Sequence, residues 1–301
     1  MESRGDNNKI IVILGPTSSG KSSVAIKLAQ KFNGEIISAD SRQIYRGMDI
    51  GTGKVTAHEQ ALAKHYMLDI VSPKTNFSAA QFKKKSEKII RDILKRGKMP
   101  IICGGTGFWI KALVDDVAYP EVKPDWKLRA KLEKKSTEKL FSLLEIKDSR
   151  RAKNIDAKNK VRLIRALEIC SALGKVPSIS SKHSKYQFLQ IGINLPKEKL
   201  HQNIEKRLKQ RFAEGMIEEV ERLHREQKIS WKKMESFGLG YLWIAKFLQK
   251  QLPHEELFSK VYSAEKDYAK RQMTWFSKDK RIIWLEKYSE IEKHVKKYLS
   301  S

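Results

Sequence analysis

One motif near the N-terminus constrains the fold of this chain more than any other feature. Residues 15–22 read GPTSSGKS and match G-x-x-x-x-G-K-[ST] at every fixed position. An apolar, β-branched run at residues 10–14 (IIVIL) precedes the motif, and a helical pattern at residues 24–32 follows it. Strand, glycine-rich loop and helix in this order form the context that a phosphate-binding P-loop requires. The sequence therefore predicts a site for a diphosphate or a triphosphate.

The chemistry of such a loop is specific. Its glycines let backbone N–H groups converge on phosphate oxygens, and the first turn of the helix adds the positive end of its dipole. The Lys21 ammonium suits a terminal phosphate and the Ser22 hydroxyl suits Mg²⁺. The predicted phosphate-binding residues are Gly15, Pro16, Thr17, Ser18, Ser19, Gly20, Lys21 and Ser22. The motif does not decide whether the phosphate itself is transferred.

Apolar strands and helical patterns alternate along the N-terminal part of the chain. Residues 34–38 and 99–103 are short strands, and residues 77–96 have helical periodicity. This alternation predicts an α/β fold, a P-loop NTPase-like doubly wound parallel sheet. From about residue 121 to 185 the pattern is helical, and residues 187–195 then return as a strand.

We therefore expect a P-loop catalytic core formed by residues 1–120 and 186–301, with a basic, mainly helical insert domain at residues 121–185. Within the core, residues 200–225 have the pattern of one long amphipathic helix, and further helices are expected from there to the end.

Charge is the strongest signal in the composition. The chain has 61 Lys and Arg against 35 Asp and Glu, a formal net charge of +26. Residues 121–185 contain 18 Lys and Arg against 8 Asp and Glu, so +10 of this charge lies in the predicted insert. Such a surface attracts a polyanion, with RNA or DNA as the leading candidates. Charge alone does not choose among RNA, DNA and acidic membranes, and solvated helix faces also carry lysines.

The compartment follows from what the sequence lacks. No run of eighteen apolar residues predicts a membrane-spanning helix, and the first residues (MESRGDNNK) have no signal-peptide core. Cys103 and Cys170 match no metal spacing and are expected as free thiols. We expect a cytoplasmic protein that does not bind membranes.

A polar cluster follows the second strand. Asp40 comes directly after residues 34–38 and is followed by residues 41–45 (SRQIY). At the carboxyl end of a strand beside a P-loop, such side chains face the ligand crevice. The Asp40 carboxylate there is suited either to hold a metal ion or to accept a proton from a nucleophile. Spacing does not decide between these two roles.

Six segments, in order along nearly the whole chain, resemble the tRNA dimethylallyltransferases, also called tRNA isopentenyl-diphosphate transferases, in their bacterial form. Residues 40–45 with 48–52 (DSRQIY and MDIGT) are similar to the family's D-S-x-Q-x-Y-x-x-x-x-I-G-T segment. The other matching segments are the P-loop, GGTG at 104–107, RLIRALE at 162–168, LHQ with IEKR at 200–207, and YAKRQ with TWF at 268–276.

The resemblance implies a reaction and roles for particular residues. Dimethylallyl diphosphate donates its prenyl group to the exocyclic amine of the adenosine 3′-adjacent to the anticodon, and diphosphate leaves. Asp40 and Thr106 are the implied catalytic residues, with Asp40 accepting the proton, and Arg207 joins the P-loop in binding diphosphate. Mg²⁺ is the implied cofactor, held at Ser22. The implied tRNA-binding residues are Asp40, Ser41, Arg42, Gln43, Thr106, Arg129, Val161, Arg162, Leu163, Ile164, Arg165, Arg271 and Gln272.

In this interpretation the basic insert grips the anticodon stem-loop through its phosphates, and the acceptor base leaves its stack to enter the site. We expect the protein to act as a monomer. The sequence departs from the family pattern at Asn203, at Val161 and at residues 240–242 (GYL), which concerns individual RNA contacts.

Three alternatives remain at the level of sequence. A P-loop nucleoside or nucleotide kinase would bind ATP and transfer phosphate, but it leaves the basic insert unexplained. A prenyltransferase acting on free AMP would not need that insert. A non-catalytic RNA-binding module would need neither the P-loop lysine nor Asp40.

Overall fold

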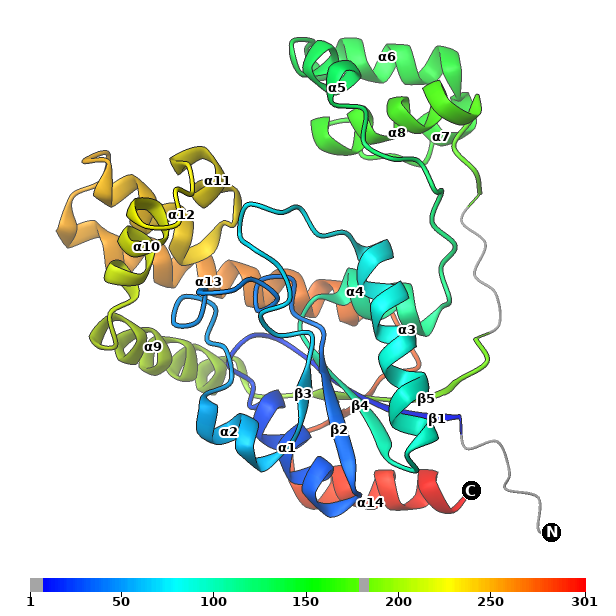
Figure 1. Ribbon diagram of the computed structural model, residues 1–301, viewed down its shortest axis with the longest axis vertical. Helices are drawn as coiled ribbons and strands as arrows, with labels where there is room; N and C mark the ends of the chain where they lie inside the picture. The colour runs from blue at the N-terminus through cyan, green and yellow to red at the C-terminus, as the bar shows by residue number, and fades with distance from the viewer. Residues whose placement is uncertain (1–7, 179–183) are drawn as a thin grey trace. The chain divides into compact units, whose positions relative to one another are not determined.

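The computed structural model describes residues 8–178 and 184–301 and divides the chain into two compact units (Figure 1). The larger one, which we call the α/β unit, combines Met1–Asp115 with His183–Ser301. The smaller one, the helical unit, is Asp116–Lys182. The insert was predicted at residues 121–185, so the smaller unit starts and ends slightly earlier than the composition indicated.

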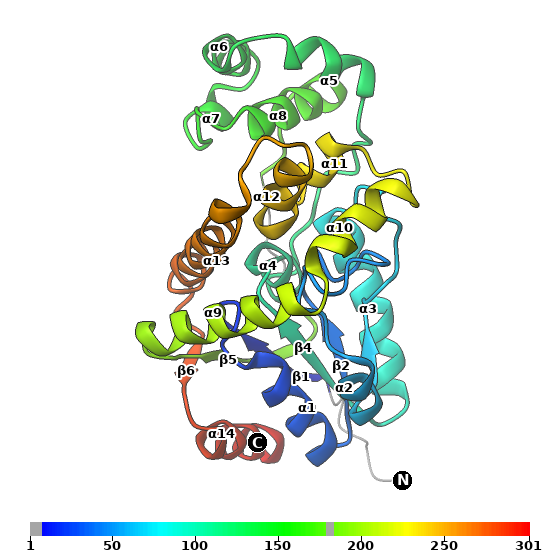
Figure 2. The ribbon, with the colours of Figure 1, turned by 90° about the vertical axis from the view of Figure 1, so that its left-hand side faces the viewer.

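The α/β unit is built on one six-stranded sheet in which every pair of neighbouring strands is parallel. The strand order is β3-β2-β4-β1-β5-β6. The strands are β1 (Lys9–Leu14), β2 (Gly34–Ser38), β3 (His65–Tyr66), β4 (Met99–Gly104), β5 (Gln187–Ile193) and β6 (Ile283–Leu285). Helices pack on both faces, as Figures 1 and 2 show, so the predicted doubly wound α/β fold is confirmed.

The central strand β1 explains why the sheet is buried on both sides. Residues 10–14 of this strand have no exposed surface, which matches a continuous β-branched run better than an alternating one. Ile11 and Ile13 belong to a core cluster with residues of α1 (Lys21–Lys31) and α14 (Tyr288–Ser300). The opposite face is covered by α3 (Ala79–Lys95) and α4 (Gly107–Val114), which pack on each other through the stacked rings of Phe82 and Trp109.

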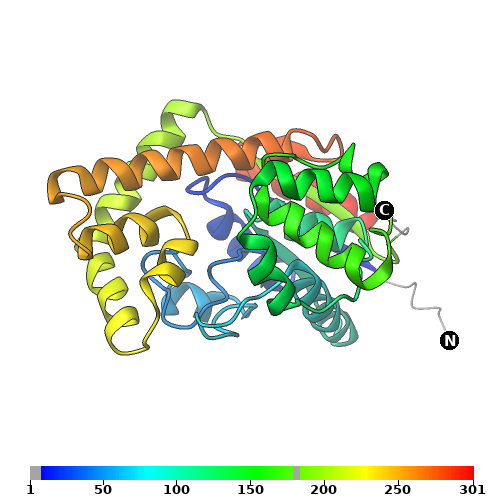
Figure 3. The same cartoon turned by 90° about the horizontal axis from the view of Figure 1, so that it is seen from above.

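The second half of the α/β unit is mainly helical. Figure 3 shows the long α13 running along one side of this group of helices. The remaining helices of the unit are α2 (Ala57–Leu62), α9 (Lys197–Ala213), α10 (Met216–Arg225), α11 (Trp231–Ser236), α12 (Leu239–Leu248) and α13 (His254–Phe276).

The structure corrects two predictions in this region. Residues 200–225 were expected as one helix, but the chain breaks between α9 and α10 at Gly215. The backbone of Gly215 has φ +93°, a left-handed conformation that glycine adopts without steric cost and that ends a helix. The region after Arg225 was expected to be helical throughout, yet β6 adds a short edge strand that pairs with β5.

The helical unit contains α5 (Trp126–Glu133), α6 (Thr137–Lys147), α7 (Ser149–Ala152) and α8 (Lys160–Leu173). Each helix starts at a residue whose side chain accepts a backbone N–H of the first turn, namely Asp125, Ser136, Asp148 and Asn159. Leu140, Leu144 and Leu163 are fully buried at the centre of the unit. The unit therefore has a hydrophobic core of its own.

None of the helices in residues 8–178 and 184–301 is both long and apolar enough to cross a lipid bilayer.

Candidate functional site

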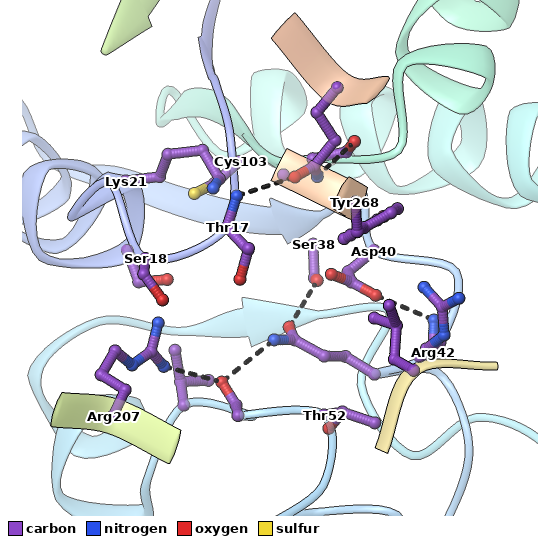
Figure 4. Close-up of a pocket in the computed structure, with 18 of the residues that line it drawn as sticks. Thr17, Ser18, Lys21, Ser38, Asp40, Arg42, Thr52, Cys103, Arg207 and Tyr268 are labelled. Atoms are coloured by element: carbon purple, nitrogen blue, oxygen red, sulfur yellow. Dashed lines mark hydrogen bonds between the residues drawn. The ribbon is translucent and has the colours of Figure 1, made fainter. Parts of the chain in front are cut away.

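One pocket gathers the P-loop, the residues after β2 and the end of β4 (Figure 4). These are the carboxyl ends of neighbouring parallel strands, where open α/β sheets bind their ligands. Residues 51–53 and side chains of α9 and α13 contribute further parts of the wall. The lining includes Thr17, Ser18, Lys21, Ser22, Ser38, Asp40, Arg42, Gln43, Gly51, Thr52, Gly53, Cys103, Arg207, Tyr268 and Gln272.

The P-loop is held from outside by two amide side chains. Gln272 accepts the backbone N–H of Thr17 at 2.8 Å and donates to the Gly105 carbonyl at 2.9 Å. Asn203 donates to the Ser18 carbonyl at 3.3 Å. These contacts tie α9 and α13 to the loop, so the two C-terminal helices fix its position beside the sheet.

Helix α1 begins at Lys21, directly after Gly20. Gly20 has a left-handed backbone conformation, and no side chain at this position caps the N–H groups of the first turn. The Lys21 ammonium donates to the Pro16 carbonyl within the loop. Burial lowers the pKa of Lys21 to about 8, and the charge of Asp40 opposes this shift. Burial also raises the pKa of the Cys103 thiol, which lies beside it, to about 11. At neutral pH Lys21 is therefore mainly a cation, and Cys103 is an uncharged thiol.

Asp40 occupies the other end of the pocket. Its Oδ1 accepts the backbone N–H of Arg42 at 2.9 Å, which turns the chain sharply after β2. The Thr106 hydroxyl accepts the N–H of Ser41 at 3.0 Å, so the two predicted catalytic residues lie on adjacent segments. Among the described residues no Lys or Arg nitrogen forms an ion pair with Asp40. The carboxylate is thus available to a bound substrate.

Arg42 and Tyr268 form the wall next to Asp40, as Figure 4 shows. Arg42 donates from Nε to the Phe237 carbonyl at 2.7 Å, and its guanidinium lies 5.1 Å from the centre of the Tyr268 ring. Burial raises the pKa of the Tyr268 hydroxyl. Tyr268 was not predicted as a site residue, although it lies one helical turn before Gln272 on the same face of α13.

Gln43 and Arg207 line the pocket between these two ends. Ser38 donates to Gln43 Oε1 at 3.1 Å, and Gln43 Nε2 donates to the Gly53 carbonyl at 3.3 Å. Arg207 Nη2 lies 3.5 Å from the same carbonyl. Figure 4 shows these contacts as a chain from Arg207 to Ser38. No carboxylate forms an ion pair with Arg207 in the described part of the chain, so its charge faces the pocket.

Two residues on α13 were predicted to contact tRNA, and the structure separates them. Arg271 is exposed, with its guanidinium 5.9 Å from the centre of the Tyr268 ring. Gln272 is buried, and both ends of its amide are bonded to protein backbone. The geometry therefore assigns Gln272 to bracing the P-loop, and its contact with RNA stays a prediction.

In the helical unit the predicted tRNA-binding segment of α8 also divides. Leu163 and Ile164 are buried in the unit's core, which corrects the expectation that their side chains contact RNA. The Val161 side chain is 76% exposed and Arg162 is exposed. Within residues 161–165, the exposed side chains therefore lie in the first turn of α8.

Arg129 and Arg165 both bind Glu168, which is fully buried. Arg129 makes two bonds to it, at 2.7 and 2.8 Å, and Arg165 makes one at 2.7 Å. Burial opposes ionisation of Glu168, but these hydrogen bonds outweigh it and lower its pKa. Both guanidiniums keep about a third of their side chain exposed, 27% and 34%. Both arginines are therefore structural partners of Glu168, and their predicted contact with RNA stays a prediction.

The residues of the pocket fit a metal ion that is held partly by the protein and partly by substrate phosphates. Ser22 lines the pocket, and no group of three or more His, Cys, Asp or Glu side chains in the described residues could hold a metal alone. Mg²⁺ is commonly held by few protein ligands together with substrate phosphates. The residues present are consistent with this mode.

A P-loop that shares its pocket with an unpaired carboxylate and further polar side chains is typical of an enzyme that transfers a group from a phosphorylated substrate. The sequence pattern of the IPP transferase family matches residues 43–279, and the chain belongs to this family.

Known proteins agree with this assignment over almost the full length. The chain is 38% identical to a tRNA dimethylallyltransferase of Acetivibrio thermocellus, with 98% of each chain covered. A crystal structure of a tRNA isopentenylpyrophosphate transferase from Bacillus halodurans superposes with a TM-score of 0.74 at 31% identity, covering 97% of each chain. A eukaryotic dimethylallyltransferase described as acting on tRNA superposes with a TM-score of 0.81 at 27% identity, covering 92% of this chain and 73% of the other.

Proposed function

We propose that this protein is a tRNA dimethylallyltransferase. It transfers the dimethylallyl group of dimethylallyl diphosphate to the N6 amine of the adenosine 3′-adjacent to the anticodon and releases diphosphate. The observation that carries the proposal is the shared pocket: the phosphate-binding Lys21 and Ser22, the carboxylate of Asp40 and the amide of Gln43 line one space. The named relatives support the choice of prenyl donor and tRNA acceptor.

The diphosphate end of the pocket favours departure of the leaving group. When the allylic C1–O bond breaks, negative charge grows on the diphosphate. Lys21, Arg207 and the N–H groups at the start of α1 are in place before the reaction, so they stabilise that charge as it develops. This role needs no transfer of phosphate, unlike that of a P-loop in a kinase.

The Asp40 end serves the acceptor. An aromatic amine is a poor nucleophile, and a carboxylate within hydrogen-bonding reach orients it and takes the proton that it loses on forming the N6–C1 bond. Thr106 holds the segment after Asp40 through the Ser41 N–H, and its hydroxyl faces the same region. The Gln43 amide, already bonded to Ser38 and to the Gly53 carbonyl, keeps one N–H and one oxygen lone pair for an adenine edge, which an amide pairs with through two hydrogen bonds.

Mg²⁺ is the cofactor that this arrangement supports. Ser22 would hold it together with diphosphate oxygens, and when bound it would neutralise part of the diphosphate charge. Of its two possible roles, we therefore assign to Asp40 the role of proton acceptor for the amine, and not that of metal ligand.

The anticodon stem-loop of the tRNA is attracted by positive charge. We assign the anticodon stem-loop to the helical unit, whose exposed first turn of α8 carries Arg162. Loop bases are displaced from their stack at lower cost than paired bases, which suits a target beside the anticodon. We further assign the protein to the cytoplasm as a monomer, where its two buried free cysteines stay reduced.

The direct test uses purified protein, Mg²⁺, radiolabelled dimethylallyl diphosphate and unmodified tRNA, with parallel reactions containing AMP or ATP with nucleosides. We expect label in tRNA only. In the Asp40→Asn variant transfer should fall about 1000-fold while tRNA binding persists, because the amine loses its proton acceptor. Label in AMP, or phosphate transfer from ATP without prenylation, would contradict the proposal.

A further inference from the structure

Glu219 is the most fully satisfied buried carboxylate near the pocket, although it does not line it. It lies on α10, 1% exposed, and accepts four hydrogen bonds. Three come from the successive backbone N–H groups of Asp49, Ile50 and Gly51, at 2.8, 2.7 and 3.0 Å. The fourth comes from the Tyr241 hydroxyl at 2.6 Å.

Three consecutive N–H groups that converge on one oxygen pair form a nest for an anion. Here the protein supplies that anion itself, and the bonds are charge-assisted and shielded from water. These hydrogen bonds fix residues 49–53. This segment forms part of the pocket wall, because Gly51, Thr52 and Gly53 line the pocket. Glu219 therefore determines where this part of the wall lies.

The same segment is held from a second side. Arg211, nearly buried, donates to the Gly51 carbonyl at 3.1 Å and binds Glu265 through two contacts of 2.6 and 2.7 Å. Gly51 also leaves no space for a side chain, because a Cβ there would lie 2.6 Å from the Tyr241 ring. α9, α10, α12 and α13 thus meet around this one turn of backbone.

The Gly53 carbonyl connects residues 49–53 to two side chains of the pocket. Gly53 O contacts both Arg207 and Gln43, at 3.5 and 3.3 Å. Arg207 is packed closely enough that a Cβ on Gly53 would lie 3.0 Å from its guanidinium. Any shift of residues 49–53 therefore moves the Gly53 carbonyl, which contacts Arg207, the arginine that faces the diphosphate.

We propose that Glu219 is a positioning residue of the diphosphate site: by holding residues 49–53 it keeps the Gly53 carbonyl, and with it Arg207, directed at the ligand. Tyr241 assists by holding the Glu219 carboxylate. This role rests on the proposed function only in taking diphosphate as the ligand of the P-loop end.

Inorganic pyrophosphate with Mg²⁺ is the probe that tests the role without requiring turnover. Isothermal titration compares the wild type with Glu219→Gln, Tyr241→Phe and Glu221→Gln. Glu221 is an exposed carboxylate on the same helix and serves as the matched control. We expect Glu219→Gln to weaken pyrophosphate binding about tenfold, Tyr241→Phe about threefold, and Glu221→Gln not at all. Circular dichroism confirms that the variants compared are folded.

A double-mutant cycle separates positioning from a general loss of stability. If Glu219 acts through Arg207, then Glu219→Gln in an Arg207→Ala background changes pyrophosphate affinity less than twofold. In steady-state kinetics the single variant Glu219→Gln should raise KM for dimethylallyl diphosphate more than it lowers kcat. Wild-type pyrophosphate affinity in folded Glu219→Gln and Tyr241→Phe, or an equal loss with and without Arg207, would overturn the inference. Failure of the wild type to prenylate tRNA would contradict the proposed function while leaving the titration result valid.

Discussion

In the α/β unit, Lys21 and Arg207 line a pocket, and in the described residues neither forms an ion pair with a carboxylate. In the helical unit, Arg129 and Arg165 share one buried carboxylate, Glu168. These two sets of cations are thus used in different ways. A cation without a carboxylate partner is ready for an anionic ligand, whereas a cation paired with a carboxylate mainly stabilises the fold. Pairing, more than the number of basic residues, separates catalytic from structural charge here.

The largest effect is expected from removing an unpaired cation. Lys21→Ala should lower kcat/KM for dimethylallyl diphosphate about 100- to 1000-fold, because a preorganised positive group opposite the leaving diphosphate is lost. Filter binding of tRNA should remain near the wild-type level. Prenyl transfer within tenfold of wild type would show that Lys21 does not face the diphosphate.

Removing the shared partner should instead affect stability. Glu168→Ala leaves two arginines without their carboxylate and the Asp125 N–H without its acceptor. Because the arginines are about one third exposed, we expect the helical unit to lose about 2–3 kcal/mol, less than for a fully buried pair. Hydrogen exchange of the α5 and α8 amides in the full chain measures this loss. Glu145→Ala, at an exposed position of α6, is the control. Unchanged protection in Glu168→Ala would contradict the structural role.

The pH dependence tests the unpaired charge without a mutation. The pKa of Lys21 is lowered to about 8, so the ammonium is present below that pH and is lost above it. For the free enzyme, kcat/KM for dimethylallyl diphosphate should therefore fall about tenfold for each pH unit above 8. The thiol of Cys103, with a pKa raised to about 11, contributes no charge in this range. A profile that stays flat to pH 9.5 would show that a neutral Lys21 suffices.

The smallest effect is expected from a charge reversal in the first turn of α8. Arg162→Glu should weaken tRNA binding about three- to tenfold and reduce the slope of log affinity against log salt by about one or two. Lys147→Glu, an equal charge reversal at an exposed position of α6, should have less effect. Equal effects of the two reversals would mean that the helical unit attracts RNA by its net charge and not through this turn.

Local patterns were sufficient to predict the sheet and the main chemical groups. The P-loop between β1 and α1, and Asp40 after β2, follow from short stretches of sequence whose geometry is fixed by their neighbours. The sequence did not reveal which polar groups the protein uses internally. Gln272 and Thr17 are 255 residues apart, and Glu219 and Gly51 are 168 apart, so only the tertiary structure joins them.

The errors in secondary structure and burial have both local and long-range causes. The apolar pattern of α9 continues into α10, and only the backbone of Gly215 marks the break between them. The edge strand β6 is three residues long and depends entirely on pairing with β5. Leu163 and Ile164 were grouped with their basic neighbours although their side chains face the opposite side of α8, into the core.

The central claim, that pairing separates the two kinds of cation, is tested most directly by two single variants measured in the same two ways. Arg207→Ala and Arg129→Ala are each titrated with inorganic pyrophosphate and Mg²⁺ and followed by hydrogen exchange at α8. We predict that Arg207→Ala weakens pyrophosphate binding about tenfold or more and leaves α8 protected, whereas Arg129→Ala binds pyrophosphate normally and loses protection at α8. Wild-type pyrophosphate affinity in Arg207→Ala, or full protection of α8 in Arg129→Ala, would contradict it.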